Sequence, residues 1–427
     1  MNIPINLSLS LLRGASLSVG IRVTGLGLAF IGQVLVSRLS GAEAYGIFMY
    51  CFAWLGLVLV FTRSGTDEAL VRFLPQATID KRLKHALVDW AFTRTATPSW
   101  LLFLAAILTA AACSLEGEAE YARIIATAAP FIPVLTLLWL YQARLRAAER
   151  TLAAFLPNEI ARPLVFILLL LLCMLFEITP AATELLILSL LATTLAVGLM
   201  MIFARDPLHV RRPRIPEEIR SWTRTANHFF LIALCLAGTA TFDIMVVGSL
   251  MPAEQTGHYA AAQRLSSFAG FGLIAVNLII APMLPPLLNR NGGHAEAERL
   301  LRFGARLATA FVLLTGLCMW LLRDPMLGLF GDGFVAAAPV LGILLLAQLV
   351  LAVSGSQITL MMMSGNERPA LTVLGFCSAL NLLLCVTLTL GLGPTGAAVA
   401  MLVTNIVQQV GLTLHSRRQL KIRADCF

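Results

Sequence analysis

The chain has 427 residues, of which 58% are hydrophobic and 13% are charged, and its mean hydropathy is +0.84. An ordinary soluble domain is about 25% charged, so this composition excludes a soluble protein. Uncharged apolar runs of about 20 residues recur along the chain, and each is long enough to cross a hydrocarbon core of about 30 Å. The sequence therefore predicts an all-α polytopic membrane protein. Its formal net charge is +8.

About twelve transmembrane helices are predicted in chain order. They lie near residues 14–37, 45–63, 86–113, 122–142, 163–178, 184–204, 227–250, 258–288, 304–322, 338–362, 370–390 and 396–415. An even number of spans places both termini on one side of the membrane. The loops on that side, together with the two tails, hold 25 of the 31 lysines and arginines, which indicates the cytoplasmic side. This bias and the attraction of anionic lipid headgroups account for the positive charge, so we expect no nucleic-acid partner.

A short repeat relates the two halves of the chain. Residues 37–46 read SRLSGAEAYG and residues 248–257 read GSLMPAEQTG, so an Ala-Glu-x-x-Gly turn returns after 211 residues. Because each half holds six spans, both halves insert in the same orientation, and two six-helix lobes are expected around a central cavity. The expected parts are an N-terminal lobe (1–204), a basic cytoplasmic linker (205–226), a C-terminal lobe (227–415) and a cytoplasmic tail (416–427).

Motifs of common catalytic and cofactor sites are missing from the sequence. It holds no Walker-type phosphate loop, no HExxH, no GxSxG and no GxGxxG after a strand. The eight cysteines and six histidines are scattered without metal-ligand spacing. We therefore expect no catalytic residue, no metal and no cofactor, and we interpret the chain as a transporter and not as an enzyme.

Ionisable side chains inside the predicted spans indicate what the cavity transports, because such groups are costly in hydrocarbon. Arg22 and Gln33 lie in the first helix, Arg264 lies in the eighth, and all three are candidate cavity residues. A guanidinium offers a planar fork of donors to phosphate oxygens, so the arginines favour a phosphate-bearing substrate. Two alternatives stay open: Arg264 forms a structural ion pair with Asp243 of the seventh helix, or Arg22 extends to the membrane surface.

Segments from both ends of the chain resemble one family. Residues 36–76, VSRLSGAEAYGIFMYCFAWLGLVLVFTRSGTDEALVRFLPQ, resemble the opening of bacterial polysaccharide transport proteins of the multidrug/oligosaccharidyl-lipid/polysaccharide exporter superfamily. Further along, FGDGFVAAAPVLGILLLAQLV, MMMSGNERPA and LGPTGAAVAMLVTN resemble later helices and turns of that family. These are loose patterns of small residues, and the resemblance depends on their order and spacing together.

The resemblance implies a flippase of O-antigen or exopolysaccharide type in the bacterial inner membrane, moving a polyprenyl-diphosphate-linked oligosaccharide from the cytoplasmic to the periplasmic leaflet. The implied partners are this lipid-linked oligosaccharide, the lipid bilayer and a polysaccharide polymerase. Related lipid II flippases have arginines in the cavity, and their patterns resemble AQRLSSFAGFGLIAVNLIIAPMLP and IRVTGLGLAF of this chain. This similarity implies a diphosphate-binding role for Arg264 and a cavity role for Arg22.

Other functions remain as alternatives. A second arginine of the lipid II flippases falls on Leu28 here, and WLGLVLVF has no arginine before Arg63, so lipid II itself is the less favoured substrate. A multidrug/cation antiporter of the same superfamily would favour an acidic cavity. An integral-membrane glycosyltransferase or ligase would usually need a large soluble loop, whereas the longest hydrophilic segment has about 22 residues.

The expected mechanism is alternating access, in which the lobes rock around the substrate. The segment SGTDEALVRF resembles the region where such proteins open toward the bilayer, so Arg63, Asp67, Glu68 and Arg72 are candidate portal residues, with solvated loop charge as the alternative. Transport needs a driving force, either the membrane potential or a coupled proton or sodium ion. Asp243 is the candidate ion or proton site.

Overall fold

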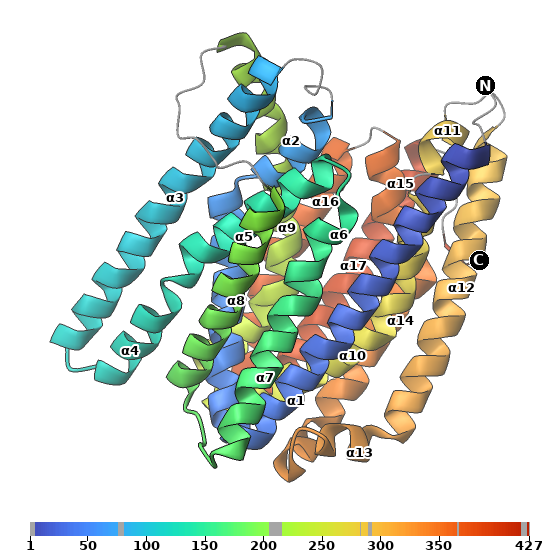
Figure 1. Cartoon of the computed structure of the whole chain (residues 1–427). Helices are drawn as coiled ribbons and strands as arrows, with labels where there is room; N and C mark the ends of the chain where they lie inside the picture. Colours follow the sequence, from blue (N-terminus) through green and yellow to red (C-terminus); the bar gives the residue numbers. More distant parts are fainter. Residues whose placement is uncertain are drawn as a thin grey trace. The chain divides into compact units, whose positions relative to one another are not determined.

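The computed structural model describes residues 5–75, 81–204, 216–281, 283–288, 293–364, 367–419 and 425–426. Every regular element within these residues is a helix, and no strand occurs among them (Figure 1). Ten helices are long and apolar enough to cross a membrane, counted over the same residues. The predicted all-α membrane fold is confirmed.

The number of spans follows from a break in the first helix. α1 (Ile5–Arg63) is 59 residues long, but Gly41 has φ 79° and ψ 176°, a conformation that glycine adopts without the steric cost that other residues meet. This residue divides α1 into two membrane-length helices. α10 (Ala253–Ile280) is a further helix of 28 residues, about 42 Å long at 1.5 Å per residue, and it is not among the ten. Counting α1 as two spans and adding α10 gives the twelve that the sequence predicts.

The chain forms two compact units. The first unit comprises Met1–Ser40 and Trp54–Leu234, and the second comprises Gly41–Ala53 and Cys235–Phe427. The short segment after the Gly41 break therefore packs with the C-terminal half of the chain, although it precedes most of the N-terminal half in sequence.

The predicted linker differs from the structure. Residues 205–215 of this segment lie outside the described residues, and residues 216–226 form the start of a long helix, α9 (Pro216–Leu250). Trp222 and Ala226 explain the difference, because both are buried in the core of the first unit. They give this charged stretch the buried face of an amphipathic helix. Hydropathy alone places the start of this helix at 227, since it detects only the apolar part.

The first unit is built from two parts of α1, residues 5–40 and 54–63, and the helices that follow it. These are α2 (Thr66–Phe73), α3 (Lys81–Leu115), α4 (Ala119–Ala128), α5 (Phe131–Ala147), α6 (Thr151–Phe155), a π-helix (Leu156–Ala161), α7 (Arg162–Leu175), α8 (Ala182–Ala204) and the first half of α9. Leu70, Leu87, Trp90, Leu140 and Trp222 meet in one buried cluster. This cluster joins α2, α3, α5 and α9.

The second unit contains the rest of the chain. Its helices after α10 are α11 (Leu284–Leu288), α12 (Gly293–Leu321), α13 (Arg323–Gly328), a 3-10 helix (Asp332–Ala337), α14 (Ala338–Ser354), α15 (Gln357–Met363), α16 (Glu367–Leu392) and α17 (Pro394–Gln419). Val276, Ile280, Leu301, Val312 and Ala352 form its largest described cluster, between α10, α12 and α14. α16 and α17 lie side by side (Figure 1).

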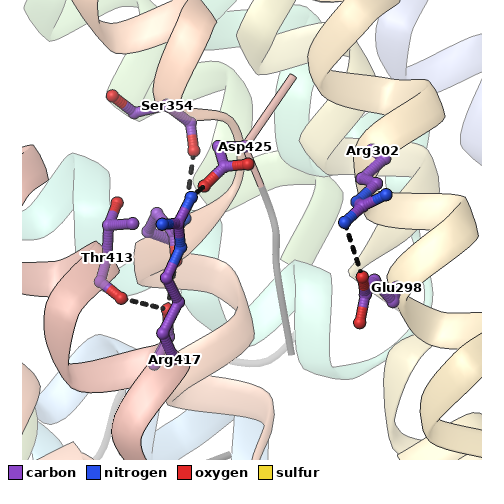
Figure 2. Close-up of polar contacts among 8 residues, drawn as sticks. Glu298, Arg302, Ser354, Thr413, Arg417 and Asp425 are labelled. Atoms are coloured by element: carbon purple, nitrogen blue, oxygen red, sulfur yellow. Dashed lines mark hydrogen bonds and ion pairs between the residues drawn. The ribbon is translucent and has the colours of Figure 1, made fainter. Parts of the chain in front are cut away.

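The expected tail is partly helical and partly docked. α17 continues to Gln419. Beyond it, Asp425 forms an ion pair with Arg417, as Figure 2 shows. The backbone N–H of Cys426 donates to the Val353 carbonyl at 3.1 Å, and Nε of Arg306 donates to the Cys426 carbonyl at 3.2 Å. The described residues of the tail therefore bind α12, α14 and α17 of the second unit.

Large apolar side chains remain on the outside of the helices. On α7, Leu168 and Leu175 are 52% and 73% exposed, whereas Leu170 of the same helix is fully buried. No more than 44% of the most apolar window is buried in any of the ten spans. Soluble proteins rarely expose such large contiguous apolar surfaces, so these faces contact lipid.

Candidate functional site

Arg22 lies in the first part of α1, where its guanidinium stacks on an aromatic ring. Cζ of Arg22 lies 4.8 Å from the centroid of the Phe155 ring, within the range of a cation–π interaction. Phe155 is buried and Arg22 is half-buried. A guanidinium over an aromatic ring can still donate its N–H groups to an oxyanion.

A π-helical segment supports this contact. Residues Leu156–Ala161 form a π-helix directly after Phe155, and such segments are frequent at functional sites. α1 approaches it closely at Gly25, where an added Cβ would lie 2.5 Å from the Glu159 carbonyl oxygen. Glycine at this position therefore allows the backbones to approach, which brings Arg22, one turn earlier, to the Phe155 ring.

Gln33 lies on the same helix as Arg22, about 16 Å further along its axis at 1.5 Å per residue. It is half-buried. Next to it, a Cβ added at Gly32 would lie 3.6 Å from the Phe166 ring, so α1 and α7 are in ordinary contact here. Arg22 and Gln33 are too far apart to bind one phosphate group together.

Arg264 lies on α10 in the second unit. Its Nε is buried and has no hydrogen-bond partner among the described residues. Its Cζ lies 5.9 Å from the centroid of the Phe268 ring, one turn further along the helix. A buried donor that lacks an acceptor costs about 1–3 kcal/mol, and more when the group is charged, so this guanidinium favours binding of an anion.

Asp243 is 1% exposed and its carboxylate is held by three donors. Oδ2 accepts hydrogen bonds from the Tyr259 hydroxyl at 2.8 Å and from Nε2 of Gln263 at 2.6 Å, and Oδ1 accepts one from the Ile244 backbone N–H at 2.8 Å. Within the described residues, Asp243 forms no ion pair with Arg264. The alternative of a structural ion pair between Asp243 and Arg264 is therefore wrong.

Sequence reasoning did not single out Tyr259 and Gln263 as partners of Asp243. A pattern that could have found them is their spacing of four residues on α10, which places both side chains on one face. A polar face on one membrane helix favours pairing with the buried carboxylate of the adjacent helix, and Asp243 lies on α9, the preceding span.

The four portal candidates lie at the end of α1 and along α2. Arg63 forms an ion pair with Asp67, and its Cζ lies 4.3 Å from the centroid of the Trp139 ring on α5. Glu68 accepts from Nη1 of Arg146, also on α5, at 3.4 Å. These contacts attach α2 to its neighbours in the first unit.

Arg72, the last portal candidate, is exposed, and its Cζ lies 5.7 Å from the ring of the adjacent Phe73. The sequence thus brings three of the portal candidates together at the start of α2, with Arg72 on its last turn. Whether any of them contacts a substrate stays a prediction, as does the expectation that Arg22 and Arg264 line one cavity.

Comparison with known proteins identifies the family. The sequence matches the family described as polysaccharide biosynthesis protein over residues 11–287, which is more than half of the chain. The chain belongs to this family. A comparison with curated protein sequences finds no match.

Solved structures share the fold of this polysaccharide biosynthesis protein. An inward-facing multidrug resistance MATE family transporter of the MOP superfamily has a TM-score of 0.73 at 14% identity, with 95% of this chain and 98% of that chain covered. Lipid II flippase MurJ in an inward closed conformation has a TM-score of 0.74 at 15% identity, with 94% and 87% covered. A MOP superfamily transporter from Pyrococcus furiosus has a TM-score of 0.64 at 13% identity, with 96% and 95% covered. At these identities the similarity establishes the fold alone, a helical membrane fold of two lobes.

The candidate residues offer binding chemistry. Arg22 and Arg264 offer guanidinium donors to oxyanions, and Asp243 offers a buried carboxylate with a defined set of donors around it. The arrangement suits recognition of an anionic group and the binding of a proton or a cation.

Proposed function

We propose that this polysaccharide biosynthesis protein is a flippase that moves a polyprenyl-diphosphate-linked oligosaccharide across the bacterial inner membrane for surface-polysaccharide or exopolysaccharide synthesis. The supporting observation is Arg264, a membrane-helix guanidinium whose buried Nε has no partner in the described residues and which Asp243 does not neutralise. An arginine in the middle of a membrane helix costs about 2.5–3.5 kcal/mol on insertion scales, and the diphosphate of the substrate offsets this cost.

In this proposal the chain performs no covalent chemistry. The sugar and diphosphate enter the cavity from the cytoplasmic side, where both termini lie, while the polyprenyl chain stays in lipid. Arg264 binds the diphosphate, Arg22 and Gln33 contact the headgroup from α1, and Arg72 attracts the substrate at the portal. The two lobes then rock to expose the headgroup on the periplasmic side, where a polysaccharide polymerase uses it.

Asp243 is the proposed coupling site. Its carboxylate oxygens are occupied by Tyr259, Gln263 and a backbone N–H, so uptake of a proton or a sodium ion changes these hydrogen bonds and links the charge of α9 to the position of α10. The membrane potential is a second energy source, because moving one charge through 100 mV is worth about 2.3 kcal/mol.

Multidrug or cation antiport is the second candidate, because the fold is shared with a multidrug resistance MATE transporter. The sign of the charge separates the two candidates. A cation exporter favours carboxylates in its cavity, whereas the membrane-spanning part of α1 offers Arg22. Lipid II transport differs from the proposed function only in the sugar and peptide of the substrate.

The test is the leaflet accessibility of lipid-linked oligosaccharide in a strain that lacks this protein. The strain is complemented with wild type, Arg264→Ala, Arg264→Lys or Arg22→Ala at matched membrane levels, and with Arg418→Gln as a control at an exposed position on the last turn of α17. We expect cytoplasmic accumulation in the deletion strain, rescue by wild type and Arg418→Gln, at least tenfold weaker rescue by Arg264→Ala and Arg22→Ala, and partial rescue by Arg264→Lys. An unchanged lipid-linked pool in the deletion strain would overturn the flippase and leave antiport.

A further inference from the structure

One face of α9 carries a series of polar and basic side chains that the proposed mechanism does not use. Arg220, Arg224, Asn227 and His228 recur at intervals of three and four residues, so they share one side of the helix. All four are exposed. They line a cavity of about 940 Å³ that ends at Leu231, where the face becomes apolar.

The opposite face of α9 fixes this orientation. Trp222 is 4% exposed, and its ring lies 5.7 Å from the Trp90 ring of α3. Ala226 is fully buried, and its carbonyl lies so close to Gly65 that no Cβ fits there. Because two contacts one turn apart hold the buried side, α9 cannot rotate to move the arginines away from the cavity.

α3 contributes another cation at the same level. Nη2 of Arg94 donates to Oδ1 of Asn227 at 2.6 Å, and Cζ of Arg94 lies 5.8 Å from the Trp90 ring. Up to Leu231, the carboxylates of α9 are those of Glu217 and Glu218 in its first turn, and none follows them. The wall of this cavity is therefore strongly positive, and Asn227 keeps its amide N–H groups for a further acceptor.

Charge and geometry together indicate the ligand. Arg220 and Arg224 lie in the charged first turns of α9, and Asn227 and His228 lie where its apolar part begins, so this face requires water or an anion. Arg220 and Arg224 are one turn apart, about 6 Å along the axis, and like charges at this spacing repel each other. An anion with two linked phosphoryl groups relieves the repulsion and accepts a guanidinium fork at each group.

We propose that this face of α9 is a second oxyanion site, distinct from Arg264, that binds the diphosphate of a lipid-linked substrate when it enters the cavity. The assignment to a transported substrate rests on the proposed function, whereas the binding of a diphosphate does not. An anionic phospholipid headgroup has the same phosphate chemistry, so the experiment has to separate the two sources.

The binding test uses the full chain in phosphatidylcholine nanodiscs with farnesyl diphosphate as the probe. Four proteins are compared: Arg264→Ala, Arg264→Ala with Arg220→Gln and Arg224→Gln, Arg264→Ala with Arg418→Gln, and wild type. We expect the Arg264→Ala protein to retain binding, the Arg220→Gln and Arg224→Gln changes to weaken that remaining binding at least tenfold, and Arg418→Gln to leave it unchanged. Because the side chains of Arg220, Arg224 and Arg418 are exposed, the variants that add these changes should unfold within a few degrees of the Arg264→Ala protein.

Equal affinity with and without Arg220 and Arg224 would overturn the site, and it would leave the flippase untouched, because Arg264→Ala is tested separately by transport. A second series replaces part of the phosphatidylcholine with phosphatidylglycerol. Retention of most farnesyl diphosphate binding supports a substrate site. Loss of that binding in proportion to the phosphatidylglycerol identifies a lipid headgroup site and overturns the substrate assignment.

Discussion

Gly46 and Gly257, which hold the same place in the two copies of the Ala-Glu-x-x-Gly repeat, pack directly against each other. A Cβ on Gly46 would lie 2.8 Å from the backbone nitrogen of Gly257, and a Cβ on Gly257 would lie 3.3 Å from that of Gly46. Each glycine also faces the carbonyl of the alanine in the other copy, Ala253 or Ala42. The contact is therefore reciprocal, and small residues at this crossing allow the two helices to approach closely.

Replacing either glycine of this contact should force the helices apart. Gly46→Ala places a methyl group against the Ala253 carbonyl, and overpacking of this kind costs about 1–3 kcal/mol. Thermal unfolding of the purified protein in detergent should show a lower Tm. Gly198→Ala is the control, because a Cβ at that position meets nothing within 4 Å. Equal melting temperatures for the two variants would contradict the contact.

Two glycines of α1 near Arg22 should respond differently to alanine. In Gly25→Ala the added methyl group clashes with the Glu159 backbone, so the π-helix has to move. This movement separates the Phe155 ring from the Arg22 guanidinium. We expect Gly25→Ala to lower both stability and transport. Gly27→Ala, with nothing within 4 Å of its Cβ, should leave both unchanged or raise stability slightly. Transport by Gly25→Ala at the wild-type rate would exclude a role for this supporting contact.

The two ion pairs of α2 should differ in strength because they differ in burial. The Asp67 side chain is 7% exposed, and Asp67→Asn leaves Arg63 without its carboxylate, at a cost of about 1–3 kcal/mol. The Glu68 side chain is 44% exposed, and Glu68→Gln should cost less than about 1 kcal/mol. Chemical denaturation of the two variants beside wild type measures the difference, and the reverse order would show that the Glu68 pair holds α2.

Tyr259 should stabilise the Asp243 carboxylate measurably. Tyr259→Phe removes a hydrogen bond to a buried carboxylate, worth about 1.5–3 kcal/mol, while it keeps the ring in place. We expect a lower Tm and a changed dependence of transport on the coupling ion. Tyr50→Phe serves as the comparison, since its hydroxyl lies 3.0 Å from Ser249 at an exposed position. A normal ion dependence in Tyr259→Phe would argue against coupling at Asp243.

Loss of the docked tail should loosen the end of α14. Removing residues 425–427 deletes the partner of Arg417 and the N–H donor to Val353. Amide hydrogen exchange should become faster in α14 and α17, and the first unit should exchange as before. Asp324→Asn is the control. It removes the ion pair between Arg323 and Asp324, whose Asp324 side chain is 59% exposed, and it should not alter exchange in α14. Unchanged exchange after truncation would show that the tail adds no stability.

Much of the fold follows from hydropathy, because a bilayer imposes both length and composition on each span. The break between the first two helices is visible as the small and polar residues around Gly41, and the repeat marks the corresponding turn near Gly257. The start of α9 is not visible in this way. Its first turns are held by Trp222 against Trp90, a tertiary contact that no local average of hydropathy detects.

The candidate site was predictable by residue type but not by partner. Arginine and aspartate inside apolar spans are conspicuous, so the sequence singles out Arg22, Arg264 and Asp243 as candidates. Which group neutralises which depends on helix rotation, and here Tyr259 and Gln263 reach Asp243 although Arg264 is the neighbour of Gln263 in sequence. Arg220 and Arg224 of the basic face fall within the predicted linker, because their charges lie next to a run of prolines and arginines.

The position of residues 41–53 in the second unit has a consequence for synthesis of the protein. This segment leaves the ribosome early, yet Tyr50 contacts Ser249, which is 199 positions later, and Gly46 packs on Gly257. Until those residues have been inserted, these two contacts of the second span cannot form. The N-terminal half therefore cannot complete its own folding during translation. If the chain were divided near residue 210 and the two halves were expressed separately, each half would lack residues that pack inside its unit.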